Sequence, residues 1–140
     1  MSPKGPLHEE VSLAVMACIR GLPAELAVLP ETTLYLTERL FLEPDYVVFK
    51  QGLAVRDLKA RDVKLAIEIG HESWPYDIGP KAKRYAEHGV QEYWAIHAPS
   101  RMTRIHRDAS AKGWSDIREL SAGEAVVALC APNTPLILSK

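Results

Sequence analysis

The sequence is poor in cysteine, carries almost no net charge and contains no long apolar run. Two cysteines cannot build a multi-disulfide scaffold, so we expect Cys18 and Cys130 to be buried free thiols in a reducing cytoplasm. No stretch approaches the roughly 18 consecutive apolar residues of a membrane-spanning helix. Residues 1–6 also lack the apolar region of a signal peptide. These absences predict a cytoplasmic protein without a membrane partner.

The net charge of −1 argues against a protein that coats nucleic acid non-specifically, because such proteins are strongly cationic. Basic residues are nevertheless clustered at 81–84 and 101–107. Each cluster is either a local nucleic-acid contact or an ordinary solvated face. The overall charge therefore leaves open a nuclease whose basic residues act locally.

The length and composition indicate an ordinary globular protein. A chain of 140 residues with 47% apolar and 25% charged residues can bury one substantial core. We therefore expect residues 1–140 to form a single domain.

Two segments have helical signatures. Apolar residues recur at helical spacing from His8 to Arg20, and Gly21 follows. Pro80 suits the first position of a short helix over 81–88, with Gly89 as its C-terminal cap. Residues 70–79 show no period and are predicted to form a loop.

The remaining apolar segments are rich in residues that favour strands. We expect an edge or half-exposed strand at 101–107, between turns at 99–100 and 108–110. The other expected strands are 25–29, 32–37, 45–49, 64–69, 92–97, 114–120, 125–130 and 136–138. The segments 64–69, 81–88 and 92–97 have the order of a parallel βαβ crossover. The fold class is therefore α/β, or α+β, with a mixed sheet.

Two acids, Asp45 and Glu68, lie on apolar runs. Strand alternation places Asp45 with Val47, and Glu68 with Ala66, so the two acids can converge if the strands are neighbours. Two carboxylates at one point raise each other's pKa, whereas a divalent cation keeps both ionised. Mg²⁺ suits a site of one or two carboxylates completed by water and phosphate oxygens. Alternatively, Asp45 faces solvent at the start of its strand and Glu68 pairs with a lysine.

A longer set of residues resembles the Uma2 family of restriction-endonuclease-like proteins, within the PD-(D/E)XK nuclease superfamily. The resemblance rests on Pro44-Asp45, Glu68, Asp77, Lys81 and the string from Tyr85 to Trp94, YAEHGVQEYW; His8 also matches a histidine common in the family. It covers roughly residues 8–107. The resemblance implies a restriction-endonuclease-like core with flanking helices.

The resemblance also implies roles for individual residues. Asp45 and Glu68 would be catalytic metal ligands, and the backbone carbonyl of Ile69 would add a third ligand. The metal would be Mg²⁺, with Mn²⁺ as a substitute, and the substrate would be DNA. A homodimer would be compatible with cutting a duplex.

The catalytic lysine is the main departure from the wider superfamily, where it stands two residues after the acid. Gly70 occupies that position here, and the resemblance places the lysine at Lys81, on the following helix. Lys83 is the alternative, since the two lysines point about 200° apart on a helix. Asp77 would either cap the helix or orient Lys81.

Two further departures concern the neighbourhood of the site. The acidic motif that family members have before the first helix is missing, and His71-Glu72 stands where a Ser-Pro-Ser type of turn is usual. The leading prediction is a Mg²⁺-dependent endodeoxyribonuclease. The alternatives are an inactive nuclease fold that serves as a binding or assembly module, and a hydrolase of RNA or another phosphodiester.

Overall fold

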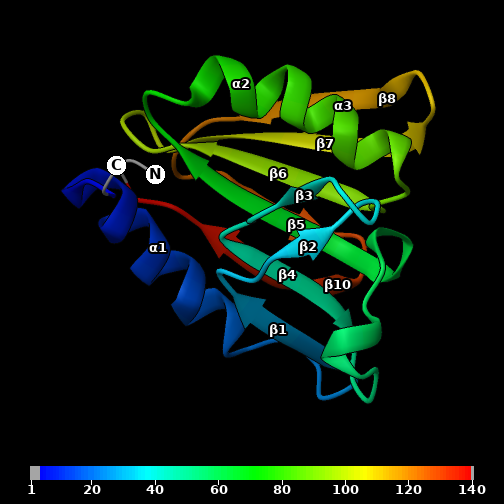
Figure 1. The fold of residues 1–140 in the computed structure, drawn as a ribbon. Helices are drawn as coiled ribbons and strands as arrows, with labels where there is room; N and C mark the ends of the chain where they lie inside the picture. Colours follow the sequence, from blue (N-terminus) through cyan, green and yellow to red (C-terminus); the bar gives the residue numbers. More distant parts are fainter. Residues whose placement is uncertain (1–3, 140) are drawn as a thin grey trace.

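The computed structural model describes residues 4–139. Residues 1–3 of the N-terminal segment 1–6, which is predicted to lack a signal peptide, lie outside that range. A mixed six-stranded sheet in the order β1-β4-β5-β6-β7-β8 forms its centre (Figure 1). β5 and β6 are parallel, and the other neighbouring pairs are antiparallel. The strands are β1 (Leu26–Pro30), β4 (Tyr46–Lys50), β5 (Val63–Gly70), β6 (Glu92–His97), β7 (Met102–Ser110) and β8 (Gly113–Leu120).

Helices and two small antiparallel sheets surround the central sheet. The helices are α1 (Pro6–Ile19), α2 (Trp74–Ile78) and α3 (Pro80–Glu87), with 3₁₀ turns η1 (Val55–Asp57) and η2 (Ala60–Asp62). The small sheets pair β2 (Leu34–Tyr35) with β3 (Phe41–Leu42), and β9 (Ala125–Ala128) with β10 (Ala131–Ile137). None of the described helices is long and apolar enough to cross a bilayer.

The core is divided between the two faces of the sheet. On one face, Val11 and Val15 of α1 and residues of β9 and β10 pack with Ile67 and Ile69 of β5. On the other face, Tyr85 of α3 and residues of the β2–β3 hairpin pack with the alternating positions of β4, β5 and β6. Strands covered on both faces explain the nearly continuous apolar runs of β4, β5 and β6 in the sequence.

The predicted α+β class and the parallel crossover are both confirmed. β5 leads through α2 and α3 into β6, which pairs with it in parallel register from Ala66 opposite Tyr93 to Gly70 opposite His97. α3 begins at Pro80, and Gly89 follows its last turn with a φ of +93°, a conformation that glycine adopts without strain. The crossover holds α3 over the face of β5 that carries Glu68.

Two strand predictions need correction. The 101–107 segment is a half-exposed strand, as predicted, but it is not an edge strand, because β8 pairs with its outer side, and it extends to Ser110. The 108–110 turn is therefore part of β7. The 32–37 strand shrinks to two residues, since the Oγ1 of Thr37 accepts the backbone N–H groups of Arg39 and Leu40 and turns the chain.

The 70–79 loop and the cysteines also differ from expectation. Residues 74–78 form α2, a helix too short to show an apolar period in the sequence. Cys18 and Cys130 are free thiols, as predicted, but both are only half-buried. Cys130 lies in the turn after β9, beyond the end of the strand predicted for 125–130.

Candidate active site

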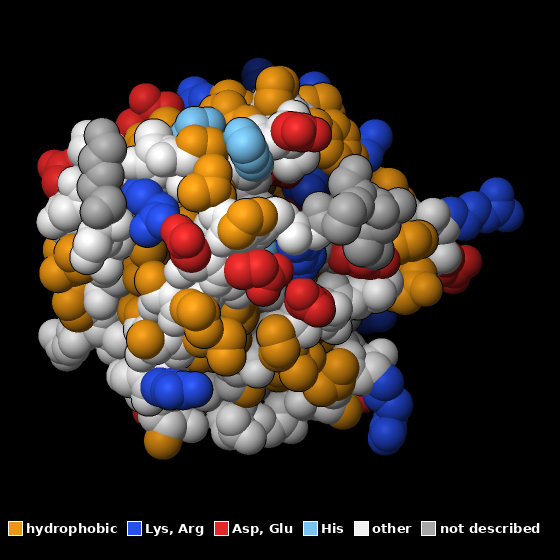
Figure 2. Space-filling view, turned by 90° about the vertical axis from the view of Figure 1, so that its left-hand side faces the viewer, with side chains coloured by type: hydrophobic (Ala, Val, Ile, Leu, Met, Phe, Trp, Pro, Cys, Tyr) orange, Lys and Arg blue, Asp and Glu red, His pale blue; other side chains and the backbone are white. Residues whose placement is uncertain are grey.

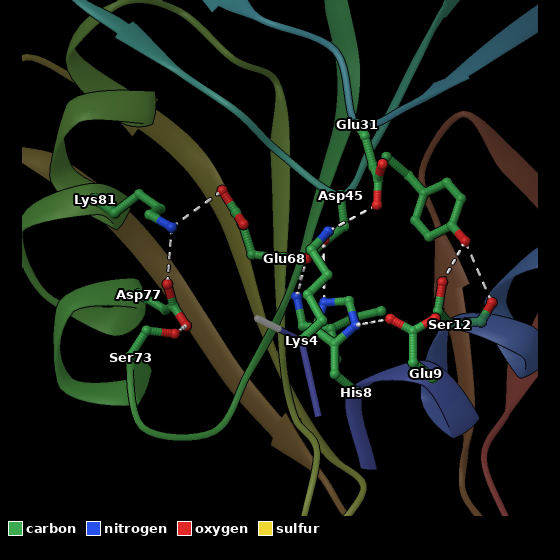
Figure 3. Close-up of polar contacts among 12 residues, drawn as sticks. Lys4, His8, Glu9, Ser12, Glu31, Asp45, Glu68, Ser73, Asp77 and Lys81 are labelled. Carbon is green, nitrogen blue, oxygen red and sulfur yellow. Dashed lines mark hydrogen bonds and ion pairs between the residues drawn. The ribbon is translucent and has the colours of Figure 1, made fainter. Parts of the chain in front are cut away.

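The two acids occupy adjacent positions where β4 begins and β5 ends. Tyr46 pairs with Ile67 and Val47 with Ala66, so the same register places Asp45, just before β4, opposite Glu68. The pair lies near the carboxyl end of β5 (Figure 3). Asp45 is 6% exposed and Glu68 is 5% exposed. The fold therefore brings the two acids together, and Asp45 does not face solvent.

Asp45 uses both carboxylate oxygens. The backbone N–H of Ile69 donates to Oδ2 at 2.7 Å. Oδ1 lies 3.0 Å from the Nζ of Lys4 and 3.1 Å from the Nε2 of His8. Lys4 lies two residues before α1 and His8 lies in the first turn of α1, so the segment around the start of α1 supplies the charged partner of Asp45.

Glu68 receives its partners from α3. The hydroxyl of Tyr85 donates to Oε2 at 2.7 Å, and the Nζ of Lys81 lies 3.3 Å from the same oxygen. Lys81 and Tyr85 are four residues apart, which places them on one face of the helix. Lys81 is thus brought to Glu68, as the prediction required.

Burial dominates the charge state of this half of the site. It raises the pKa of Glu68 to about 7, and the carboxylates of Asp45 and Asp77 act in the same direction. The Lys81 ammonium and the Tyr85 hydroxyl oppose that rise. Burial alone would lower the pKa of Lys81, but Glu68 and Asp77 raise it above its ordinary value. Lys81 therefore stays cationic while Glu68 titrates near neutrality.

Asp77 holds Lys81 from the other side. Its Oδ1 lies 2.9 Å from the Nζ of Lys81, and its Oδ2 accepts the hydroxyl of Ser73 at 2.8 Å. Asp77 lies inside α2, and the N-terminal position of α3 has no side-chain cap. Of its two predicted roles, capping is therefore wrong, and orienting Lys81 agrees with the contacts.

Gly70 makes this arrangement possible. A Cβ at residue 70 would overlap the Oδ2 of Asp77 and would lie 3.2 Å from its Cγ. The resemblance described above places the lysine of the wider superfamily at this position. Without a side chain at 70, Asp77 can occupy the space beside β5 and reach Lys81 on α3.

Other candidates remain outside the site. Lys83, His71 and Glu72 are exposed, and no side-chain contact joins them to either acid among the described residues. Lys64, in the strand predicted for 64–69, is the extra residue of a β-bulge opposite Val48 and Phe49. The bulge breaks the alternation, and the charge of Lys64 acts on the Cys130 thiol.

The oxygen atoms of the two acids are suitable donors for a divalent metal ion. Asp45 and Glu68 offer hard oxygen donors at adjacent register positions, and the Oε1 of Glu68 accepts no hydrogen bond from the described residues. Within residues 4–139, no group of three or more His, Cys, Asp and Glu side chains is arranged to hold a metal. Two carboxylates completed by other oxygens suit Mg²⁺ rather than Zn²⁺. The residues present therefore fit the predicted type of ion.

The contacts of Lys4 and Glu31 were missed from the sequence. Lys4 joins Asp45 to Glu31, with 2.8 Å between its Nζ and the Oε1 of Glu31. Lys4 and Asp45 are 41 residues apart, and no periodic pattern includes Lys4. His8 was noted only as a family match, whereas its side chain reaches Asp45.

Comparisons with known proteins identify the family and support the fold. The model of the Uma2 family, described as "Putative restriction endonuclease", matches residues 1–134. The chain belongs to the Uma2 family. The crystal structure of "a putative nuclease belonging to DUF820" from Anabaena variabilis ATCC 29413 superimposes with a TM-score of 0.64 at 14% identity. The match covers 92% of this chain and 74% of that chain.

Among the curated proteins, none matches. The Uma2 family model, which spans nearly the whole chain, therefore carries the assignment, and the structural match supports the fold alone.

The surface above the strand ends combines both signs of charge. Figure 2 shows acidic and basic side chains next to one another near the middle of the face on the left of Figure 1. Hydrophobic side chains border them. No continuous basic surface is visible on this face, which agrees with the near-neutral net charge.

Proposed function

We propose that this Uma2 protein is a divalent-metal-dependent endonuclease that hydrolyses phosphodiester bonds of DNA. The observation that carries the proposal is the juxtaposition of Asp45 and Glu68, with the ammonium group of Lys81 3.3 Å from Glu68. Buried acids beside a held cation match the needs of phosphodiester hydrolysis, in which positioning and charge stabilisation supply most of the rate.

The carboxylates of Asp45 and Glu68, with the backbone carbonyl of Ile69, would hold Mg²⁺ or Mn²⁺. When bound, such an ion supplies an activated water and stabilises the charge that develops on the phosphate. The Ile69 N–H fixes the orientation of the Asp45 carboxylate at 2.7 Å. The protein therefore orients its ligands through its own hydrogen bonds.

Lys81 is the proposed catalytic lysine. Its ammonium group donates to the attacking water or to a phosphate oxygen and stabilises negative charge in the transition state. Asp77 holds the side chain in place, and Glu68 keeps it cationic. Lys81 on α3 would thereby take the role of the superfamily lysine, whose position on β5 is occupied by Gly70 in this chain.

Metal binding and cleavage test the proposal separately. Mn²⁺ titration should show binding to the wild type and a loss of roughly tenfold or more in Asp45→Ala and Glu68→Ala. Supercoiled plasmid should be nicked with Mg²⁺ and left intact in EDTA. Equal, negligible metal binding in all three proteins would reject the nuclease and favour a binding or assembly module.

The substrate and the assembly need their own measurements. Parallel reactions with duplex DNA, single-stranded DNA and RNA test the choice of DNA as substrate, since metal-assisted hydrolysis of a phosphodiester is chemically alike in all three. Sedimentation with and without a DNA duplex tests the homodimer. The cytoplasmic location remains a prediction from the cysteine content.

A further inference from the structure

A second lysine, Lys4, lies on the other acid of the site. Its Nζ is 3.0 Å from the Oδ1 of Asp45 and 2.8 Å from the Oε1 of Glu31. Figure 3 shows Lys4 and Lys81 approaching the acid pair from opposite sides. Each of the two carboxylates proposed as metal ligands therefore has its own ammonium partner in the metal-free protein.

The two ammonium groups are held very differently. Lys81 is anchored by Asp77, whose side chain is 2% exposed, and both lie on the α2–α3 crossover. Lys4 is anchored by Glu31, whose side chain is 69% exposed. Lys4 also precedes the first helix, so its contact with Asp45 can break without moving any strand or helix.

Both carboxylate oxygens of Asp45 already have partners. Oδ2 accepts the backbone N–H of Ile69, a group fixed by the sheet. Oδ1 is the oxygen that Lys4 and His8 contact. A divalent cation and an ammonium group at one carboxylate oxygen repel each other strongly, because the buried site screens their charges weakly. The two cations therefore compete for Oδ1.

We propose that Lys4 occupies the cation-binding oxygen of Asp45 in the metal-free protein and must leave it when a divalent metal binds. This inference rests on the proposed metal site. Lys4 with Glu31 is then a built-in competitor that lowers the affinity for metal and keeps the paired acids charge-compensated before loading. Release transfers Lys4 to Glu31 alone or to solvent.

Mn²⁺ titration calorimetry on the whole chain tests the competition. Lys4→Met should bind Mn²⁺ roughly tenfold more tightly than wild type, because the ammonium group no longer has to be displaced. Lys4→Arg, which keeps the charge, should bind within about threefold of wild type. Lys112→Met removes a lysine from the β7–β8 turn, remote from the site in sequence, and should leave the affinity unchanged.

A side-chain NMR measurement distinguishes displacement of the Lys4 ammonium group from a change in the electric field around it. The ¹⁵N resonance of the Lys4 ammonium should be visible without metal, and saturating Mg²⁺ should move it toward the position of an exposed lysine. A Lys4 signal unmoved by saturating Mg²⁺ would overturn the inference, as would equal or weaker Mn²⁺ binding by Lys4→Met. If neither wild type nor Lys4→Met binds metal, the proposed function itself fails.

Discussion

The two halves of the site contain the same kinds of groups but differ in how firmly they are held. In the Glu68 half, a buried acid meets a lysine and a tyrosine from one helix, with a second buried acid behind the lysine. In the Asp45 half, the acid meets a lysine and a histidine from the N-terminal segment, and the second acid is exposed Glu31. One half is built into the crossover, whereas the other depends on Lys4 and His8 at the start of α1 and on exposed Glu31.

The difference in how the two lysines are held fits two different roles for them. A cation that must act on a reacting phosphate has to be preorganised, and Lys81 meets this requirement through Asp77 and Glu68. A cation that only balances charge until metal arrives has to be removable, and Lys4 meets that requirement. A lysine paired with an acid can thus either be held in place for catalysis or fill a metal-binding oxygen until the metal binds. The element that carries the lysine decides between these roles.

The largest expected difference between the halves is in cleavage. Lys81→Gln keeps a donor for Asp77 but removes the charge, so we expect the DNA cleavage rate to fall by roughly 10²–10³-fold with metal binding retained. Lys4→Met should not reduce cleavage at saturating Mg²⁺. Single-turnover plasmid nicking measures both rates.

Lys83→Gln is the matched control for this experiment, because Lys83 lies on the same helix and is exposed. It should cleave at nearly the wild-type rate. Full activity in Lys81→Gln would reject Lys81 as the catalytic lysine, and a large loss in Lys83→Gln would move the role to that residue.

The next effect concerns the space that Gly70 leaves for Asp77. In Gly70→Ala the added Cβ overlaps the Asp77 carboxylate, so we expect a loss of about 1–3 kcal/mol in unfolding free energy. Displacing Asp77 also frees Lys81, and cleavage should fall by roughly tenfold to a hundredfold. Urea unfolding and plasmid nicking measure the two effects.

Gly21→Ala is the control, since a Cβ there meets only ordinary contacts at 3.4 and 3.5 Å and needs no unusual backbone angle. It should change neither quantity appreciably. Unchanged stability and cleavage in Gly70→Ala would show that Asp77 is not confined by β5 and that its position is not needed to orient Lys81.

The Glu68 half could be predicted well from the sequence. The period of two places Glu68 with Ala66 on one face of its strand, and the family resemblance places the lysine at Lys81 on the following helix. The role of Gly70 could not be predicted, because it depends on where α2 sits. α2 is five residues long and leaves no period in the sequence.

The Asp45 half was only partly predictable. The apolar run that follows Asp45 points to this acid, but its side-chain partners Lys4 and His8 are far away in the sequence. Lys4 in turn pairs with Glu31, and no local pattern connects these residues. Likewise, the pattern of β7 showed one half-buried face but could not show that β8 would pair with its free side. Local periodicity predicts which way a side chain faces, and long-range contacts decide what it meets.

Neutralising Glu68 and neutralising Asp45 should change the unfolding free energy in opposite directions. In EDTA at pH 8, Glu68→Gln should raise the unfolding free energy by about 1–3 kcal/mol, because it removes a buried charge whose pKa lies near 7. Asp45→Asn should lower it by about 1–3 kcal/mol, because the amide cannot satisfy both the Ile69 N–H and Lys4. Urea unfolding measures both.

The raised pKa of Glu68 determines how the unfolding free energy depends on pH. Its pKa is raised from 4.5 to about 7 on folding, so its stabilising contribution is complete below pH 4.5 and is lost as the pH rises through 7. The advantage of Glu68→Gln over wild type should therefore shrink at pH 5. An advantage of equal size at pH 5 and pH 8 would show that the raised pKa is not its cause.

The smallest effect tests the hydroxyl that Tyr85 donates to Glu68 at 2.7 Å. Tyr85→Phe should lower the unfolding free energy by about 1 kcal/mol at pH 8 and by less at pH 5, where Glu68 is protonated. Because the hydroxyl lowers the pKa of Glu68, its loss should also move the pH midpoint of Mn²⁺ binding upward.

Tyr93→Phe is the matched control, since its buried hydroxyl donates to the Asp77 backbone carbonyl, which does not titrate. Tyr93→Phe should lower the unfolding free energy by a similar amount at pH 5 and pH 8. If the loss has the same pH dependence in both variants, the strength of the Tyr85 hydrogen bond does not depend on the charge of Glu68.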